Sequence, residues 1–395
     1  MDKIKIKGGR QLNGEIFISG AKNAALPLIC ASLLTEETVT LTNMPILSDI
    51  KSMNLLLEQL GTQIDSFDDF VDGHPTKTYS YRTPELTSIA APYDYVRKMR
   101  ASYYVLGPLL ARAGKVELSL PGGCAIGTRP MDIHLAAMEE MGAKIDIRNG
   151  YVYGEVDGRL KGAHIVFRTV SVGATCNVLM AATLAEGITV LENAAKEPEI
   201  GDLINLLNDM GAKISGIGTS ILTIEGVEKL HGARHKVIPD RIEAGSYAVA
   251  AAITGGKIEL INAQTYTLKT PMQILQKMGV EVMPTERGIL VDATGKKLIG
   301  EDIITEPFPG FPTDLQAQFM ALLTVAEGAG MVTETIFENR FMHVPELLRM
   351  GANINVHGHA SAIVRGVKKL SGAPVMATDL RASFALVLAG LAAEG

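Results

Sequence analysis

One short stretch of the chain, from Ser119 to His134, carries residue types suited to chemistry on an anionic substrate. It reads SLPGGCAIGTRPMDIH, so Cys124 sits between glycines, in backbone that can bend and approach a ligand closely. Arg129 follows nearby and would favour the thiolate form of Cys124 if the two side chains lie close in space. Taken alone, the same stretch also fits an ordinary surface loop. The rest of the chain must decide between these two interpretations.

Further polar and charged residues recur at the starts of predicted helices. Helix N-termini present free N–H groups and a positive dipole end, which suits phosphate and carboxylate groups. Lysine and arginine oppose that dipole, so an anionic ligand would explain Lys22, Arg100 and Arg381 at such places. Aspartates there are ordinary caps, and for Asp314 alone capping is the favoured interpretation.

Composition and charge exclude several classes of protein. The length of 395 residues favours two or three domains, and the net charge of −6 gives no argument for nucleic acid or an anionic membrane. Apolar runs such as 24–34 and 384–393 are too short to span a bilayer. The three cysteines and eight histidines form no zinc or other ligand pattern, and no glycine-rich nucleotide loop occurs. We therefore expect a cytoplasmic protein without a bound metal.

A pattern of about seventy residues repeats along the chain. Each repeat combines a strand pair, an apolar first helix, a β-type strand and a second helix that ends at a C-capping glycine. First helices are expected at 22–37, 96–114, 172–187, 241–256, 313–328 and 380–395, and the strands after them at 38–42, 115–120, 188–191, 257–261 and 331–336. The C-capping glycines would be Gly61, Gly142, Gly211, Gly279 and Gly351.

The repeats suggest two domains of three repeats each. We expect one domain over 22–238 and the other over 1–21 plus 239–395, with a break near Pro239. The sixth repeat lacks its second half, so we expect about two dozen further residues in the natural protein. The opening segment would pack with the C-terminal half, which is short of that piece. If the helix starts of the two domains face each other, they form a charged cleft with the Cys124 loop as its lid.

Seven motifs, in chain order, resemble those of the enolpyruvyl transferases of peptidoglycan synthesis. They occupy 19–24, 99–102, 121–130, 171–175, 311–318, 337–343 and 379–383. The similarity extends over essentially the whole chain. The family fold is a two-domain inside-out α/β barrel of six repeated units, three per domain, which agrees with the repeat count.

The resemblance implies a reaction and two central residues. The enolpyruvyl group of phosphoenolpyruvate would move to the 3-hydroxyl of UDP-N-acetylglucosamine with release of phosphate, the first committed step of peptidoglycan synthesis. No metal, organic cofactor, nucleic acid or membrane would take part. Cys124 matches the position that donates a proton to the methylene carbon and is alkylated by fosfomycin, a role that suits a thiol near Arg129. Asp314 matches the base that contacts the sugar hydroxyl.

The same resemblance assigns the binding residues. Those matching positions that handle the phosphate or carboxylate of phosphoenolpyruvate are Lys22, Asn23, Arg129 and Arg381, of which Lys22 and Arg381 also count as catalytic. Those matching nucleotide-sugar contacts are Arg100, Arg129, Pro130, Met131, Asp132, Ile133, Thr169, Val170, Ser171, Val172, Asp314 and Ile336, with Arg340 beside them. Thr169 stands where the family often has lysine. The family also usually continues past Gly395 with a further arginine that faces phosphoenolpyruvate.

Two alternatives stay open at this point. The related transferase that acts on shikimate 3-phosphate shares the sixfold architecture, but it lacks the cysteine-bearing loop in this form. The second alternative is a catalytically silent paralogue that only holds the nucleotide sugar. The incomplete sixth repeat is the one feature that favours it.

Overall fold

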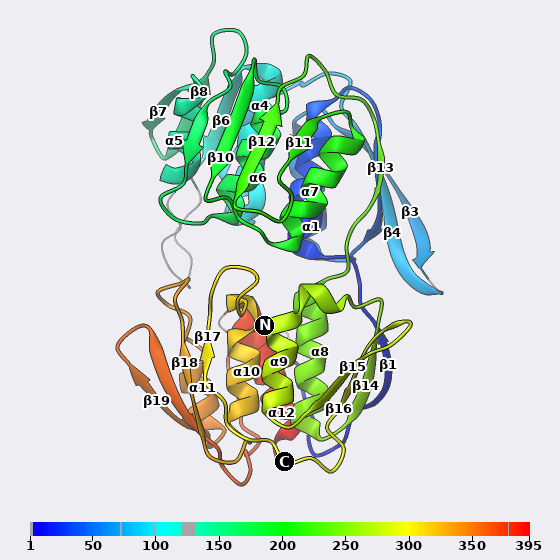
Figure 1. The fold of residues 1–395 in the computed structure, drawn as a ribbon, viewed down its shortest axis with the longest axis vertical. Helices are drawn as coiled ribbons and strands as arrows, with labels where there is room; N and C mark the ends of the chain where they lie inside the picture. The colour runs from blue at the N-terminus through cyan, green and yellow to red at the C-terminus, as the bar shows by residue number, and fades with distance from the viewer. Residues whose placement is uncertain (1–2, 72, 98, 121–130, 378) are drawn as a thin grey trace. The chain divides into compact units, whose positions relative to one another are not determined.

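The computed structural model describes residues 3–71, 73–97, 99–120, 131–377 and 379–395 (Figure 1). The chain is an α/β protein that divides into two compact units. The unit called here the C-terminal domain contains residues 3–18 and 239–395, and the N-terminal domain contains 19–120 and 131–238. The change of unit thus falls after Ile18, where the sequence-based boundary was residue 21. No helix within the described ranges is long and apolar enough to cross a membrane.

The third repeat shows how each repeat is built. It contains β9 (His164–Val166), α6 (Val172–Ala182), β10 (Ile188–Glu192), α7 (Pro198–Asp209), β11 (Lys213–Ser215) and β12 (Ile221–Glu225). The strands form one sheet in the order β11-β12-β10-β9, in which β9 and β10 are parallel and the other neighbours antiparallel. A parallel pair needs a crossover connection, and α6 supplies it.

The other repeats follow the same order with small variations. The first contains α1 (Lys22–Ala31), η1 (Ser32–Leu34), β2 (Val39–Met44), α2 (Ser48–Gln59), β3 (Gln63–Val71) and β4 (His74–Arg82). The second contains β5 (Ala90–Ala91), α3 (Tyr93–Val96), η2 (Arg100–Val105), α4 (Leu106–Ala113), β6 (Lys115–Ser119), α5 (Asp132–Glu140), β7 (Lys144–Arg148) and β8 (Tyr151–Glu155). The fourth contains β1 (Asn13–Phe17), α8 (Arg241–Thr254), β14 (Lys257–Ile261), η3 (Thr265–Thr267), α9 (Lys269–Lys277), β15 (Glu281–Pro284) and β16 (Gly288–Asp292). The fifth contains β17 (Ile303–Ile304), η4 (Thr313–Leu315), α10 (Gln316–Leu323), β18 (Ala329–Thr333), α11 (Val344–Arg349), β19 (Asn353–His357) and β20 (Ser361–Arg365), and α12 (Leu380–Ala392) belongs to the sixth.

The glycines predicted to end the second helices all adopt the backbone conformation that this role requires. Their φ angles are +107° at Gly61, +92° at Gly142, +98° at Gly211, +98° at Gly279 and +89° at Gly351. A side chain is strained in this left-handed region, whereas glycine is not. The prediction of C-capping glycines is confirmed. The expected starts of the first helices at Lys22, Val172, Arg241, Thr313 and Leu380 are confirmed as well.

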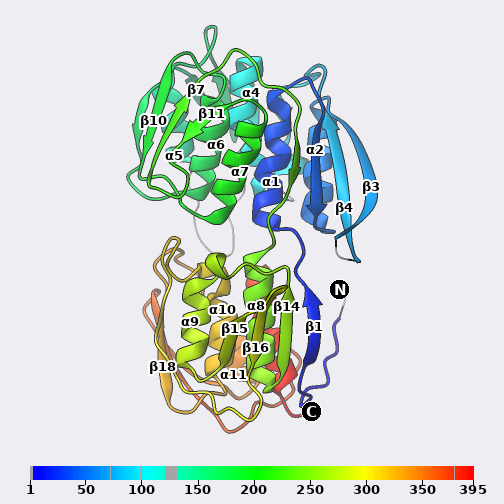
Figure 2. The ribbon, with the colours of Figure 1, turned by 45° about the vertical axis from the view of Figure 1, so that its right-hand side comes forward.

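Two strands complete repeats that are distant in sequence. β1 pairs in parallel with β14, from Asn13 opposite Lys257 to Phe17 opposite Ile261, and Figure 2 shows them side by side. β13 (Arg234–Lys236), which follows the third repeat, pairs in parallel with β2 of the first. The opening segment therefore does pack with the C-terminal half. Its strand β1 fills an edge of the fourth repeat, and the Gly9 N–H donates to the carbonyl of Leu391, in α12 of the sixth repeat, at 2.9 Å.

In the C-terminal domain the first helices lie inside and the sheets outside. α8, α10 and α12 contact one another and lie between the two sheets of this domain (Figure 1). Every residue of α10 is buried, as expected for a helix that is covered on all sides. Gly245 of α8 permits the close approach, because a Cβ there would lie 2.5 Å from Leu315 Cδ1. The central packing also brings the starts of α10 and α12 together.

A buried ion pair holds β13, the strand that follows the third repeat, against α7. His235 of β13 lies 2.9 Å through its Nε2 from Asp202 Oδ1 of α7, and the Ile238 N–H donates to the other oxygen of Asp202 at 3.3 Å. Burial lowers the pKa of His235, but Asp202 and Asp209 outweigh burial and leave that pKa above its usual value. The charged form of His235 is therefore favoured in the folded N-terminal domain.

Candidate active site

Asp314 is held between two arginines at the point where α10 and α12 begin. Arg340 Nη2 donates to Asp314 Oδ1 at 2.5 Å, and Arg381 Nη2 donates to Asp314 Oδ2 at 2.6 Å. The exposed fractions of the side chains are 5% for Arg340, 19% for Arg381 and 24% for Asp314. Because the cluster is largely shielded from water, these charges interact more strongly than surface pairs do. The structure thus brings together three residues that the sequence predicted separately.

The two guanidinium groups determine the protonation state of Asp314. Burial by itself raises the pKa of the carboxyl group, but the charges and hydrogen bonds of Arg381 and Arg340 outweigh burial. The net result is a pKa far below the usual value for aspartate. Asp314 is therefore ionised at neutral pH, and it is a weak base for as long as both arginines stay in place.

The interpretation of Asp314 as a helix cap is wrong. The N-cap residue of η4 is Pro312 and that of α10 is Leu315, and neither has a side-chain cap hydrogen bond. Asp240 and Asp379 are true caps: each accepts from the two backbone N–H groups at the start of its helix, at 2.8 and 3.0 Å. Asp314 differs because its carboxylate accepts hydrogen bonds from the buried Arg340 and Arg381 and not from the backbone N–H groups of the helix.

A second charged pair lies at the start of α1 in the N-terminal domain. Lys22, the first residue of α1, lies 3.3 Å through its Nζ from Asp49 Oδ2 in the first turn of α2. Asn23 follows Lys22 in the same helical turn. The lysine opposes the dipole of its own helix, and Asp49 offsets that charge. The pair is 19% and 35% exposed, so the lysine remains within reach of a ligand.

Apart from Asp314, described above, the residues predicted to contact the nucleotide sugar lie at helix starts of the N-terminal domain, with one further exception. Met131 is the N-cap residue of α5, and Asp132 and Ile133 form its first turn; Asp132 pairs with Arg168. Thr169 and Val170 lead to Ser171, whose Oγ caps α6 by accepting from the Ala174 N–H at 3.2 Å. Val172 begins that helix. Ile336 is the exception, because it lies in the C-terminal domain with 37% of its surface exposed.

Four predicted residues cannot be placed fully. Arg100 begins η2, but its side chain is outside the described part of the structure. Cys124, Arg129 and Pro130 fall within 121–130, outside the described residues. The predicted lid and the cleft that it would cover therefore stay predictions.

The other two cysteines are inert by position. Cys30 and Cys176 are 0% and 1% exposed in the core of the N-terminal domain. Burial raises the pKa of both thiols, and the reactive form of cysteine is the thiolate. Neither cysteine can serve a substrate in the folded chain.

We expect one thiol per folded chain to react with a disulfide reagent such as DTNB, and all three to react after unfolding in guanidinium. The reactive thiol would be Cys124, so Cys124→Ala should leave almost no native reactivity. Absorbance of the released thiolate measures both numbers. If native Cys124→Ala still reacts rapidly with one equivalent, then Cys30 or Cys176 is accessible and the assignment is wrong.

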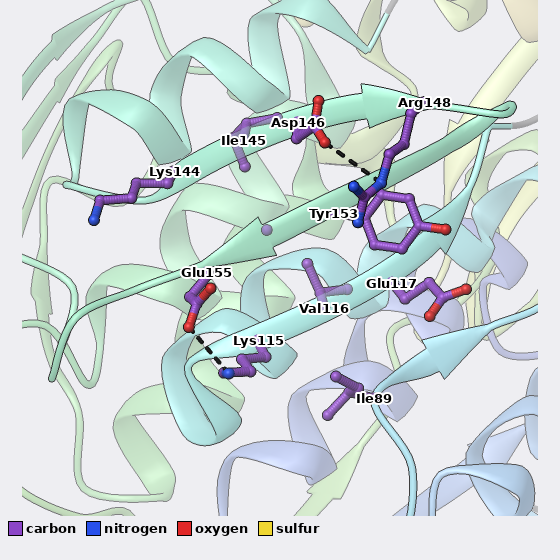
Figure 3. A pocket seen from close by; sticks show the side chains of 11 residues that line it. Ile89, Lys115, Val116, Glu117, Lys144, Ile145, Asp146, Arg148, Tyr153 and Glu155 are labelled. Carbon is purple, nitrogen blue, oxygen red and sulfur yellow. Dashed lines mark ion pairs between the residues drawn. The ribbon is translucent and has the colours of Figure 1, made fainter.

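A cavity of about 340 Å³ lies on the sheet of the second repeat, away from the predicted site residues (Figure 3). Its lining carries three basic and three acidic side chains, of which Lys115 pairs with Glu155 at 3.0 Å and Arg148 with Asp146 at 3.5 Å. Arg148 also covers the ring of Tyr153 at 4.5 Å. Because these charges already compensate one another, the cavity presents no net charge for an anionic substrate.

Two further findings concern metal ligands and histidine. In the ranges that the structure describes, no group of three or more histidine, cysteine, aspartate or glutamate residues could hold a metal ion. His343 is the N-cap residue of α11, but its side chain makes no capping hydrogen bond: it is 1% exposed, with its Nε2 at 3.1 Å from Met320 Sδ. Burial lowers the pKa of His343 to about 4.

Sequence reasoning also passed over Arg241 as a site residue. It is 8% exposed at the start of α8, and its guanidinium carbon lies 5.9 Å from the centre of the Phe308 ring. The available signal was a charged pair, Asp240–Arg241, at the same place in the fourth repeat as Asp379–Arg381 in the sixth. Burial lowers the pKa of Arg381 in the Asp314 cluster and the charge of Arg241 acts in the same direction, while the charges of Asp314 and Asp240 raise it above its usual value.

The model of the EPSP synthase (3-phosphoshikimate 1-carboxyvinyltransferase) family matches residues 6–395, and the chain belongs to this family of enolpyruvyl transferases. Two relatives called UDP-N-acetylglucosamine 1-carboxyvinyltransferase are similar over the whole chain. The protein of Paramagnetospirillum magneticum is 60% identical over 396 residues, which cover 100% of this chain and 91% of that relative. The protein of Granulibacter bethesdensis is 60% identical over 395 residues, which cover 100% of this chain and 92% of that relative.

Solved structures agree on the fold. The enolpyruvyl transferase NikO from Streptomyces tendae matches with a TM-score of 0.84 and 24% identity, over 98% of this chain and 90% of that one. EPSP synthase from Acinetobacter baumannii matches with a TM-score of 0.73 and 19% identity, over 99% of this chain and 92% of that one. At such identities the likeness concerns the fold alone. The expected enolpyruvyl transferase fold is confirmed.

Proposed function

We propose that this protein transfers the enolpyruvyl group of phosphoenolpyruvate to the 3-hydroxyl of UDP-N-acetylglucosamine and releases phosphate. The observation that carries the reaction class is the ionised Asp314 between two arginines, which pairs a base with anion-binding groups at one place. The choice of acceptor is supported by 60% identity to relatives that bear this activity in their names. Shikimate 3-phosphate is the weaker candidate, because the solved EPSP synthase shares only 19% identity.

The proposed reaction is an addition followed by an elimination. In the addition, Asp314 takes the proton of the sugar hydroxyl, whose oxygen bonds to C2 of phosphoenolpyruvate, while the Cys124 thiol gives a proton to the methylene carbon C3. In the elimination, C3 returns a proton to the Cys124 thiolate, the bond between C2 and the phosphate oxygen breaks, and the double bond between C2 and C3 forms again. The departing phosphate takes the proton held by Asp314, so both residues return to their starting states. Proton transfers of this kind contribute about 10²–10⁴-fold each to rate.

The arginines also suggest how the base is activated. Phosphoenolpyruvate carries a carboxylate and a phosphate, and either group can compete with Asp314 for Arg381. When Arg381 turns to the substrate, Asp314 loses a positive neighbour and its pKa rises toward a value useful for a base. Asp314 would then accept a proton efficiently only when phosphoenolpyruvate is bound.

The remaining site residues would divide between the two substrates. Lys22, Asn23, Arg129 and Arg381 would bind phosphoenolpyruvate. The nucleotide sugar would contact Ile336, with Arg340 in support, and the residues of the N-terminal domain given above. The names of the relatives support a place in peptidoglycan synthesis. Both substrates are small anions, so we propose that the protein acts in the cytoplasm, without nucleic acid or membrane as partner.

Phosphate release distinguishes this proposal from its rivals. The protein mixed with phosphoenolpyruvate and UDP-N-acetylglucosamine should release one phosphate per acceptor consumed, and the product should gain the mass of an enolpyruvyl group. Release only with shikimate 3-phosphate would identify the other transferase. Binding of UDP-N-acetylglucosamine by calorimetry, with no phosphate release under any condition, would identify a silent binder.

A further inference from the structure

A buried glutamate lies behind the Asp314 cluster and plays no part in the steps above. Glu334 follows β18 and is 4% exposed. Its Oε1 accepts from the Thr305 hydroxyl at 2.9 Å and from the N–H groups of Ile336 and Phe337 at 2.8 and 3.1 Å. Its Oε2 accepts from the Thr313 hydroxyl at 2.9 Å. Within the described part of the chain it forms no ion pair, so donors alone stabilise this buried charge.

The other repeats show that the fold does not need a carboxylate at this place. The equivalent position is asparagine in the first, third and fourth repeats: Asn43 near the end of β2, Asn193 directly after β10 and Asn262 directly after β14. All three have positive φ, and each donates its Nδ2 to a backbone carbonyl of the neighbouring segment, at 2.8 to 3.1 Å. Glutamate in the fifth repeat therefore departs from the structural solution of its sister repeats. It does so in the repeat that carries Asp314.

The Thr313 hydroxyl links Glu334 to the site. A carboxylate can only accept, so the single hydroxyl proton of Thr313 points to Glu334. The oxygen of Thr313 then faces Arg340 Nε, which donates to it at 3.3 Å. With Nε held there, the Nη2 group of the same guanidinium reaches Asp314. The contacts form one chain: Glu334, Thr313, Arg340, Asp314.

We propose that Glu334 is a positioning residue for the Asp314–Arg340 pair and acts through the Thr313 hydroxyl. Its part in the reaction rests on the proposed function. The chain of contacts keeps Arg340 on Asp314 when a substrate draws Arg381 away, so the base stays in place at the moment it is needed. In metal sites, residues that orient the metal ligands contribute about 10–100-fold to activity, and we expect an effect of similar size from Glu334.

The test uses Glu334→Gln, Thr313→Val and their combination, with Thr313→Ser as the matched control that keeps the hydroxyl. If the glutamine amide nitrogen faces Thr313, it donates to the hydroxyl oxygen, and the hydroxyl proton then points toward Arg340 Nε, which is also a donor. If the amide oxygen faces Thr313, the amide nitrogen faces the N–H groups of Ile336 and Phe337, which are donors as well. We expect each of Glu334→Gln and Thr313→Val to lower kcat about tenfold or more with KM changed less than about threefold. Thr313→Ser should be close to wild type.

The double variant tests whether Glu334 and Thr313 act through the same series of contacts. We expect the double variant to be no slower than the slower single variant, because residues in one network are not additive. Multiplied effects, or a folded Glu334→Gln within twofold of the wild-type kcat, would overturn the proposal. If Glu334→Gln does not fold, the proposal is tested by the kcat of Thr313→Val relative to that of Thr313→Ser. Equal kcat values in these two variants would overturn it.

A second readout does not depend on activity. Crystal structures of Glu334→Gln and Thr313→Val should show the Arg340 guanidinium moved away from its place on Asp314. An Arg340 that keeps its place in both variants would overturn the positioning role. A wild-type protein that releases no phosphate with UDP-N-acetylglucosamine would instead count against the proposed function, and the structures would still test the contact chain.

Discussion

Asp314→Asn is expected to lower kcat about a thousandfold, because an amide of the same size cannot take the proton of the sugar hydroxyl. The variant should also lose stability. Arg340 is 5% exposed and would keep its charge without a carboxylate partner, a situation that costs about 3–5 kcal/mol when a buried pair is broken. Steady-state phosphate release measures the first effect. Urea unfolding, monitored by circular dichroism, measures the second.

Asp292→Asn is the matched control for this variant. Asp292 also forms an ion pair in the C-terminal domain, with Lys257 at 2.9 Å, but it lies on the outer sheet and not among the buried arginines. We expect its activity to equal that of the wild type. The role of Asp314 as the base is refuted if folded Asp314→Asn keeps more than about a tenth of the wild-type kcat, since general-base catalysis contributes at least about a hundredfold.

Acid should destabilise the protein through two buried histidines, one in each domain. Burial lowers the pKa of His134 to about 4. Burial also lowers the pKa of His343 to about 4, where the nearby charge of Asp379 acts in the opposite direction and that of Arg340 in the same direction. Both values lie below the usual 6.5, so the unfolded chain binds these protons first as the pH falls. Stability is complete above pH 6.5 and declines toward pH 4. At pH 5 the expected loss is about 2 kcal/mol for each histidine.

Glutamine variants at these two positions test the expected loss. His134→Gln and His343→Gln remove the titrating group, so the double variant should lose less stability than the wild type between pH 7.5 and pH 5. Urea unfolding at several pH values measures the difference. His235→Gln provides a comparison of opposite sign, because the raised pKa of His235 gives stability that is present below pH 6.5 and lost as the pH rises through the folded value. Equal acid sensitivity in the wild type and the double variant would contradict the prediction.

The sequence alone was sufficient for the local features of the fold. Glycines such as Gly61 and Gly279 were predicted as helix caps, and their positive φ angles agree. The starts of α1, α6, α8 and α12 were placed correctly, because capping residues and apolar periodicity act over a few neighbours. The expected strand at 331–336 is an instructive exception. It ends at Thr333, since the Glu334 carboxylate accepts from the backbone of Ile336 and Phe337 and draws the chain out of the sheet.

Only the tertiary structure decided which distant segments meet. The repeat count predicted that the opening segment packs with the C-terminal half, but no local pattern indicated that β1 pairs with β14, more than two hundred residues away. Asp314 looked like a cap in its own turn and became the centre of a charged cluster, because the packing of α10 on α12 brings Arg381 to it and a loop of the same repeat brings Arg340. Local backbone preference sets a cap, but the strength of an ion pair depends on burial and on the partners that the fold supplies.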